Sequence, residues 1–182
     1  MVRTEIRVAG FGGQGIALAA RILSRAIAVY GGKNAVFTQS YGPESRGGAS
    51  SANIVVDTEE IDFPYPLNPD IFVVMSKEAY DKNIDDIKEG AQVFYDTELV
   101  ELDERAKRAG NIYGIQSTKI AESLGVKIAA NIVMLGFVSS KIHEVIDKEN
   151  LKKCVLEAVP ARFVAKNDAA FEQGYAAGKE VN

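Results

Sequence analysis

Short apolar segments with the period of a strand alternate along this chain with longer segments that have the period of a helix. The strand-like segments are residues 5–9, 35–38, 50–56, 71–75, 91–95 and 111–115. The helix-like segments are residues 15–30, 76–90, 117–124, 127–141, 147–158 and 167–178. Strands that alternate with helices predict an α/β fold, in which a doubly wound, mostly parallel, Rossmann-like sheet carries helices on both faces.

Residues suited to begin or end helices stand at the ends of several helix-like segments. Gly31 is expected to end the first helix, and Ser76 to begin the second. Asn167 is expected to begin the last helix and Gly178 to end it. The chain has 182 residues, 47% of them hydrophobic, and neither a repeat nor a low-complexity tract, so we expect a single domain over residues 1–182.

A glycine-rich turn joins the first predicted strand to the first predicted helix. Its sequence, GFGGQG, matches the pattern in which small residues permit a tight turn and a helix N-terminus offers N–H groups to an anion. A dinucleotide site also needs an acidic residue after the second strand, where this chain has Thr38 to Tyr41. NAD binding and a purely structural turn both remain open for this motif. The candidate binding residues are Gly10, Gly12, Gly13, Gln14 and Gly15.

A second glycine-rich loop, YGPESRGG, follows the second predicted strand. In a parallel doubly wound sheet this loop leaves the same edge as the first turn, so the two loops should be neighbours. Arg46 has a planar fork that suits a carboxylate or a phosphate, and an ion pair with Glu44 inside the loop is the alternative. The candidate binding residues here are Tyr41, Gly42, Glu44, Ser45, Arg46 and Gly47.

Composition narrows the chemistry of this chain. It has one cysteine, Cys154, and one histidine, His143, which excludes a disulfide within the chain. An iron–sulfur cluster or a structural zinc ion needs about four such ligands, so neither is expected here. His143 fits a helix end or the surface, and Cys154 fits a buried position. No catalytic or metal-ligating residue is predicted.

Charge and hydropathy restrict the partners. The formal net charge of −4 argues against nucleic acid, which binds clustered Lys and Arg. The longest uncharged stretch, residues 128–140, is shorter than the roughly 20 residues that span a bilayer. The first residues lack the hydrophobic region of a signal peptide. We therefore expect a cytoplasmic protein with no membrane partner.

The two loops, taken in order, also carry a family resemblance. GFGGQG followed by QSYGPESRGGASSANIVV resembles the gamma subunit, or the equivalent domain, of the 2-oxoacid:ferredoxin oxidoreductases. The resemblance extends over nearly the whole chain and includes AANIVMLGF and KNDAAFEQGY. Within this superfamily, the form YGPESRGG is most similar to the 2-oxoglutarate type, and the indolepyruvate and branched-chain enzymes are related.

The resemblance implies a multi-subunit enzyme that converts a 2-oxoacid and coenzyme A to an acyl-CoA and carbon dioxide and passes electrons to ferredoxin. It implies thiamine diphosphate, magnesium and iron–sulfur clusters on partner subunits, because this chain has no Gly-Asp-Gly motif and a single cysteine. This chain would complete the assembly, with its loops contacting partner subunits, thiamine diphosphate or coenzyme A. The alternative is an independent nucleotide- or dinucleotide-binding protein.

Overall fold

A computed structural model describes residues 3–41 and 48–181 of the chain and contains a six-stranded sheet. The strand order across the sheet is β2-β3-β1-β4-β5-β6. The strands are β1 (Thr4–Phe11), β2 (Asn34–Tyr41), β3 (Ala49–Asp57), β4 (Ile71–Val74), β5 (Gln92–Asp96) and β6 (Asn111–Ile115). All four residues of β4 are buried, as expected from its uninterrupted apolar sequence.

Strands β1, β4, β5 and β6 are parallel, and β3 is antiparallel to both of its neighbours, β1 and β2. The link between β2 and β3, residues 42–48, is shorter than the dozen or more residues that a parallel crossover requires. β3 therefore returns as the second strand of a hairpin. Because β3 opposes both neighbours, β2 runs in the direction of β1, and the predicted mostly parallel α/β sheet is confirmed.

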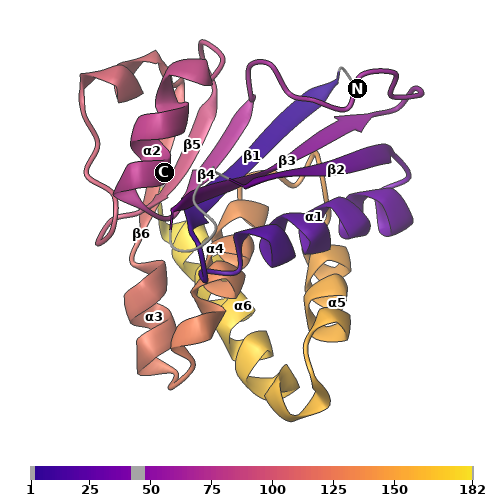
Figure 1. The fold of residues 1–182 in the computed structure, drawn as a ribbon. Helices are drawn as coiled ribbons and strands as arrows, with labels where there is room; N and C mark the ends of the chain where they lie inside the picture. Colours follow the sequence, from indigo (N-terminus) through magenta and orange to yellow (C-terminus); the bar gives the residue numbers. More distant parts are fainter. Residues whose placement is uncertain (1–2, 42–47, 182) are drawn as a thin grey trace.

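The helices cover both faces of the sheet, as Figure 1 shows. On one face lie α1, α4, α5 and α6, whose buried side chains join those of Ile6, Ile54 and Val73 in the larger core cluster. On the other face, α2 packs over Phe72 and Val74 in a smaller cluster. The helices are α1 (Ile16–Tyr30), α2 (Lys77–Asn83), α3 (Ser117–Ser123), α4 (Ala130–Ser139), α5 (Lys148–Ala158) and α6 (Val164–Glu180). None of the helices in the described ranges is long and apolar enough to cross a membrane.

The last helix corrects two predicted ends. α6 begins at Val164, after a 3₁₀ turn, and continues past Gly178 to Glu180. Asn167 lies inside the helix, where its side-chain amide donates to the carbonyl of Phe163 at 2.9 Å. Gly178 does not end the helix. Its lack of a side chain serves the close packing of α6 on α4 instead, because an added Cβ there would collide with the side chain of Ser140.

Two other predicted helices are shorter than their hydrophobic patterns suggested. The second ends as an α-helix at Asn83 and continues as a 3₁₀ turn over Ile84–Asp86. The segment expected from residue 127 starts as a 3₁₀ turn over Lys127–Ala129, and α4 follows from Ala130. Ser76 caps α2 as predicted, since its hydroxyl accepts the backbone N–H of Ala79 at 3.3 Å.

Candidate glycine-loop site at the carboxyl edge of the sheet

The first glycine-rich turn lies at the point where the sheet reverses its winding. From β1 the chain passes through α1 to β2, on one side, whereas from β4 it passes through α2 to β5, on the other. A crevice between the carboxyl ends of two such strands is where open α/β sheets bind their ligands. The turn from Gly10 to Gly15 occupies the β1 side of this crevice, and Met75 follows β4 on the opposite side.

Gln14 bridges this crevice with its own side chain. Its Oε1 accepts the backbone N–H of Phe11 at 2.6 Å, and its Nε2 donates to the carbonyl of Met75 at 2.8 Å. The side chain also crosses close over Gly10, where an added Cβ would lie 2.5 Å from Gln14 Oε1. Both polar ends of Gln14 are therefore used within the protein, across the crevice in which open α/β sheets bind their ligands.

Gly15 is fixed by a residue from the far half of the chain. It begins α1 in the left-handed conformation, with φ 72°, and an added Cβ would collide with the side-chain amide of Asn131. Asn131, in α4, is buried and donates from Nδ2 to the carbonyl of Gly15 at 3.1 Å. Sequence reasoning missed Asn131, although a lone amide in an apolar helix signals a buried hydrogen bond.

Gly13 differs from its neighbours because it faces open space. Its φ of 101° lies in the left-handed region, and an added Cβ meets no described atom within 4 Å. Of the candidate glycines, Gly10 and Gly15 are thus packed against this chain, whereas Gly13 leaves backbone accessible at the start of α1. Among the described residues, the geometry thus leaves Gly13 open to close approach by a ligand or another chain.

The second glycine-rich loop begins and ends beside the first turn. Phe11 pairs with Ala49 and Tyr41 pairs with Ser50, so β1 and β2 end at the same edge of the sheet. The backbone N–H of Gly12 donates to the carbonyl of Gly48 at 3.2 Å, which joins the two segments directly. The predicted candidates Gly42, Glu44, Ser45, Arg46 and Gly47, and the side chain of Tyr41, lie outside the described residues.

An open cleft of about 540 Å³ adjoins the first turn. Gly13 and Gln14 form one side, and the side chains of Leu99 and Ile128 form much of its apolar rim. Ile128 is 84% exposed and Leu99 is 38% exposed, so the rim leaves apolar surface uncovered. Lys127 also lines the cleft, but it is paired with Glu122 at 2.8 Å, and this hydrogen bond raises the pKa of the lysine.

Asp96 organises the neighbouring edge of the sheet beneath this cleft. It is fully buried at the end of β5, and its Oδ2 accepts the hydroxyls of Ser117 and Thr118 at 2.5 and 2.9 Å. The same oxygen accepts the backbone N–H of Thr118 at 2.9 Å, at the start of α3. Because these donors come from the protein, Asp96 holds the start of α3 against the end of β5.

The remaining candidates have the structural roles expected of them. His143 is exposed, in the turn after α4. Cys154 is buried, and this burial raises the pKa of its thiol, so it lacks the thiolate character of a reactive cysteine. Within residues 3–41 and 48–181, no three His, Cys, Asp or Glu side chains are grouped so as to hold a metal ion.

The fold and the site together define an α/β domain of the Rossmann-like class in which a glutamine of the glycine-rich turn bridges the dinucleotide crevice. The chain belongs to the pyruvate ferredoxin/flavodoxin oxidoreductase family, whose model matches residues 5–177. It is 49% identical over 181 residues to the 2-oxoglutarate synthase subunit KorC of Methanocaldococcus jannaschii, covering 99% of this chain and 96% of that one. The family predicted from the two glycine-rich loops is confirmed.

Solved structures share the fold over nearly the whole chain. The gamma subunit of a keto/oxoacid ferredoxin oxidoreductase from Geobacter sulfurreducens matches with a TM-score of 0.87 and 35% identity, and 99% and 98% of the two chains are covered. A 2-oxoglutarate:ferredoxin oxidoreductase from Magnetococcus marinus, solved with 2-oxoglutarate, coenzyme A and succinyl-CoA bound, matches with a TM-score of 0.86 and 26% identity. This chain covers 32% of that longer chain.

Proposed function

We propose that this chain is the gamma subunit of a multi-subunit 2-oxoglutarate:ferredoxin oxidoreductase, which forms succinyl-CoA and carbon dioxide from 2-oxoglutarate and coenzyme A. The chain acts as one folded domain in the cytoplasm. Its part in the enzyme is to complete the assembly and to contribute the glycine-rich carboxyl edge. The similarity to the 2-oxoglutarate synthase subunit supports the enzyme, and the junction of the two loops at Gly12 and Gly48, beside the open backbone of Gly13, is the observation that carries the role of this edge.

The carboxyl edge suits a phosphate-bearing ligand such as coenzyme A better than it suits a catalytic group. The N-terminus of α1, with Gly13 open beside it, is a favourable place for a phosphate. The sequence of the second loop also contains Arg46, whose guanidinium is suited to bind a phosphate. The apolar rim formed by Leu99 and Ile128 suits either the pantetheine arm of coenzyme A or an apolar surface of a partner subunit.

Thiamine diphosphate with its magnesium ion, and the iron–sulfur clusters, are proposed to reside on the partner subunits. A single buried cysteine does not fit a cluster, and the sequence has no Gly-Asp-Gly motif. Thiamine diphosphate supplies the carbanion chemistry of decarboxylation when it is bound. The gamma subunit orients the partner surfaces around that reaction, and the isolated chain has no turnover.

Reconstitution tests this proposal. The thiamine-binding and cluster-binding subunits are combined with or without this chain, and 2-oxoglutarate- and coenzyme A-dependent reduction of ferredoxin is followed. We expect activity only when this chain is present. Arg46→Ala should lower the turnover or raise the KM for coenzyme A, whereas the exposed Arg162→Ala should leave both unchanged. Full activity of the mixture without this chain would contradict the proposal.

The competing dinucleotide-binding function is tested on the chain alone. Because Gln14 bridges the crevice between β1 and Met75, calorimetry with NAD, NADP and FAD should detect no saturable binding at micromolar concentrations. Saturable binding to the lone chain would favour an independent dinucleotide-binding protein.

A further inference from the structure

The link between β3 and β4 turns apolar side chains outward, at the end of the sheet opposite the glycine-rich turn. Phe63, Tyr65 and Leu67 are 49%, 58% and 69% exposed, whereas Pro66 and Pro69 are buried. The rings of Phe63 and Tyr65 meet edge to face, with centroids 5.8 Å apart. Exposed apolar side chains that lie together with polar residues around them are typical of an interaction site, so this arrangement indicates a surface that another protein covers.

Residues 63–69 of this link are held in place by hydrogen bonds from neighbouring segments. The carboxylate of Glu5 in β1 accepts the backbone N–H groups of Leu67 and Asn68 at 2.9 and 3.1 Å through Oε2. Its other oxygen, Oε1, accepts from Arg3 at 3.0 Å. Asn68 is fixed further by a 3.0 Å bond from its amide to the carbonyl of Asp86. The prolines also restrict φ, so little conformational entropy is lost when the exposed side chains are bound.

The sequence of this link is acidic, although the guanidinium of Arg3 lies beside it, donating to the carbonyl of Tyr65 at 3.4 Å and pairing with Glu5. Residues 57–70 contain five carboxylates, at Asp57, Glu59, Glu60, Asp62 and Asp70, and neither Lys nor Arg. Asp70 is paired with Lys88, but Glu59, Glu60 and Asp62 are exposed to solvent. An apolar tip with an acidic base is complementary to an apolar pocket that has Lys or Arg at its rim.

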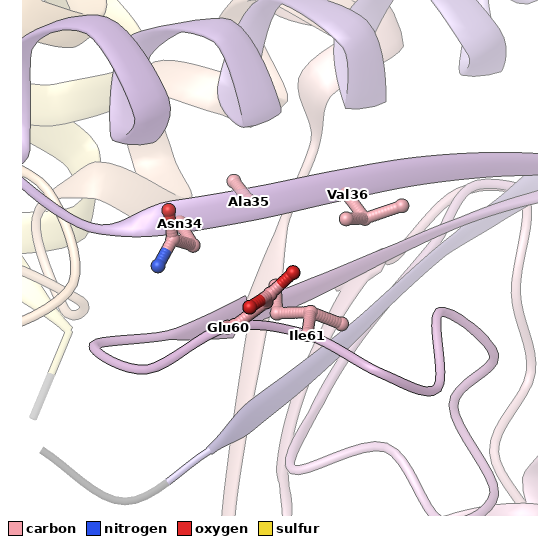
Figure 2. A pocket seen from close by; sticks show the side chains of 5 residues that line it. All are labelled: Asn34, Ala35, Val36, Glu60 and Ile61. Carbon is pink, nitrogen blue, oxygen red and sulfur yellow. The ribbon is translucent and has the colours of Figure 1, made fainter.

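A hollow of about 520 Å³ lies directly before the link, between Glu60, Ile61 and the start of β2. Figure 2 shows Glu60 and Ile61 opposite Asn34 and Val36 across this hollow, whereas the side chain of Ala35 points to the other side of β2. The side-chain amide of Asn34 donates to the carbonyl of Glu59 at 2.8 Å, which anchors the segment beside the strand. The carboxylate of Glu60 makes this hollow suitable for a basic side chain of a partner.

We propose that residues 59–67 form a docking surface for a different subunit of the enzyme. Phe63, Tyr65 and Leu67 enter an apolar pocket of that subunit, and Glu60 receives one of its Lys or Arg side chains. The inference rests on the proposed function, because the partner is a subunit of the same assembly. A second copy of this chain is not the partner, since a twofold axis through the link would bring its carboxylates together.

The test compares variants within the reconstituted complex. Tyr65→Ser should raise the apparent Kd for assembly at least about tenfold, as expected when an aromatic residue central to an interface is truncated. Val29→Ser is the matched control, because Val29 is also an apolar residue that is 58% exposed, on α1. Glu60→Gln should weaken assembly less than Tyr65→Ser does, and it should reduce the dependence of the Kd on salt. Glu144→Gln, at another exposed carboxylate, should change neither the Kd nor its salt dependence.

Mass photometry of the diluted complexes gives the Kd values, and circular dichroism checks that each variant is folded. Assembly of Tyr65→Ser at the wild-type Kd would overturn the docking surface, and so would an equal loss for Val29→Ser. Concentration-dependent dimerisation of the lone chain that Tyr65→Ser abolishes would overturn it in favour of a second copy. Failure of the wild-type chain to assemble would instead contradict the proposed function, so the two failures are distinguishable.

Discussion

At the scale of single residues, the glycine-rich turn combines two kinds of glycine. Gly13 needs a left-handed backbone but faces open space, whereas Gly15 needs the same backbone and also lies against Asn131. The pattern G-x-G-x-x-G contains both kinds without distinguishing them. The contact with Asn131 joins positions 116 residues apart, so nothing local in the sequence could predict it.

Gly15→Ala tests the second kind of glycine. Gly32 is the matched control, because its φ of 63° is also left-handed and an added Cβ there meets no described atom within 4 Å. Gly32→Ala should lower the free energy of unfolding by about 1 kcal/mol through backbone strain. Gly15→Ala should lower it by about 2–4 kcal/mol, since the collision with Asn131 adds an overpacking cost. Urea denaturation measures both, and equal losses would contradict the packing role of Gly15.

Gln14→Ala tests the bridge across the crevice. The substitution leaves the N–H of Phe11 and the carbonyl of Met75 without their partner, so the free energy of unfolding should fall by about 1–3 kcal/mol. Gln173→Ala, on the exposed face of α6, should change it by no more than about 0.5 kcal/mol. A Gln14→Ala protein as stable as the wild type would show that water replaces both bonds without cost.

At the scale of elements, α4 and α6 approach so closely that glycines form their interface. Gly136 in α4 faces the backbone of Phe171, and Gly174 in α6 faces the backbone of Val133. The hydrophobic pattern predicted both helices. Gly178 was expected to end the second of them, because glycine after an apolar segment is typical of a helix end. Only the packing of the two helices shows that these glycines are contact positions.

Gly174→Ala tests this interface. In an isolated helix alanine would be about 1 kcal/mol more favourable than glycine. Here the added Cβ collides with the carbonyl of Val133, so we expect a loss of about 2 kcal/mol or more and a lower Tm. Ala176→Gly, at an exposed position of the same helix, should reduce stability by only about 1 kcal/mol. Stabilisation by Gly174→Ala would contradict the close approach.

The pairing of α5 with α6 predicts a pH dependence. Glu172 accepts hydrogen bonds from Lys152 and Lys148 at 2.8 and 2.9 Å, and these bonds hold the pKa of the carboxyl below its usual 4.5. A lowered folded-state pKa contributes stability above the unfolded-state value, and this contribution is lost as the pH falls through the folded-state value. Because Glu172 is partly solvated, its contribution is expected to be no more than about 1 kcal/mol.

Urea denaturation of Glu172→Gln between pH 6 and pH 3 measures this contribution. The variant should be less stable than the wild type at pH 6, and the difference should shrink as the pH falls below 4.5 through the lowered folded-state pKa of Glu172. Glu144→Gln, at an exposed carboxylate, should follow the wild-type curve. A difference that stays constant with pH would assign the loss to packing instead of charge.

At the scale of the whole molecule, hydrophobic periodicity was sufficient to predict the order of the strands and helices along the chain, and it was sufficient to predict the fold class. The position of β3 between β1 and β2 depends on strand pairing, which alternation along one strand does not encode. The meeting of the two glycine-rich loops at the carboxyl edge could be predicted, because both glycine patterns are local and each follows directly on a strand. The bridge by Gln14 and the outward-facing link at residues 63–67 were not predicted, because each depends on contacts between distant segments.

The central position of β1 has a consequence for how the chain folds. β1 pairs with β3 on one side and with β4 on the other, so the two halves of the sheet meet only through this strand. The pairings of β1, β2 and β3 involve only residues 4–57: β2 and β3 close over the short link of residues 42–48, whereas β1 reaches β3 only across α1 and β2. The first 57 residues can thus form a three-stranded nucleus with α1, on which β4, β5 and β6 add in sequence order. Both pairings of β1, with β3 and with β4, join segments that are distant in the sequence, and such pairing is intrinsically slow, so formation of the two β1 interfaces is expected to limit the rate of folding.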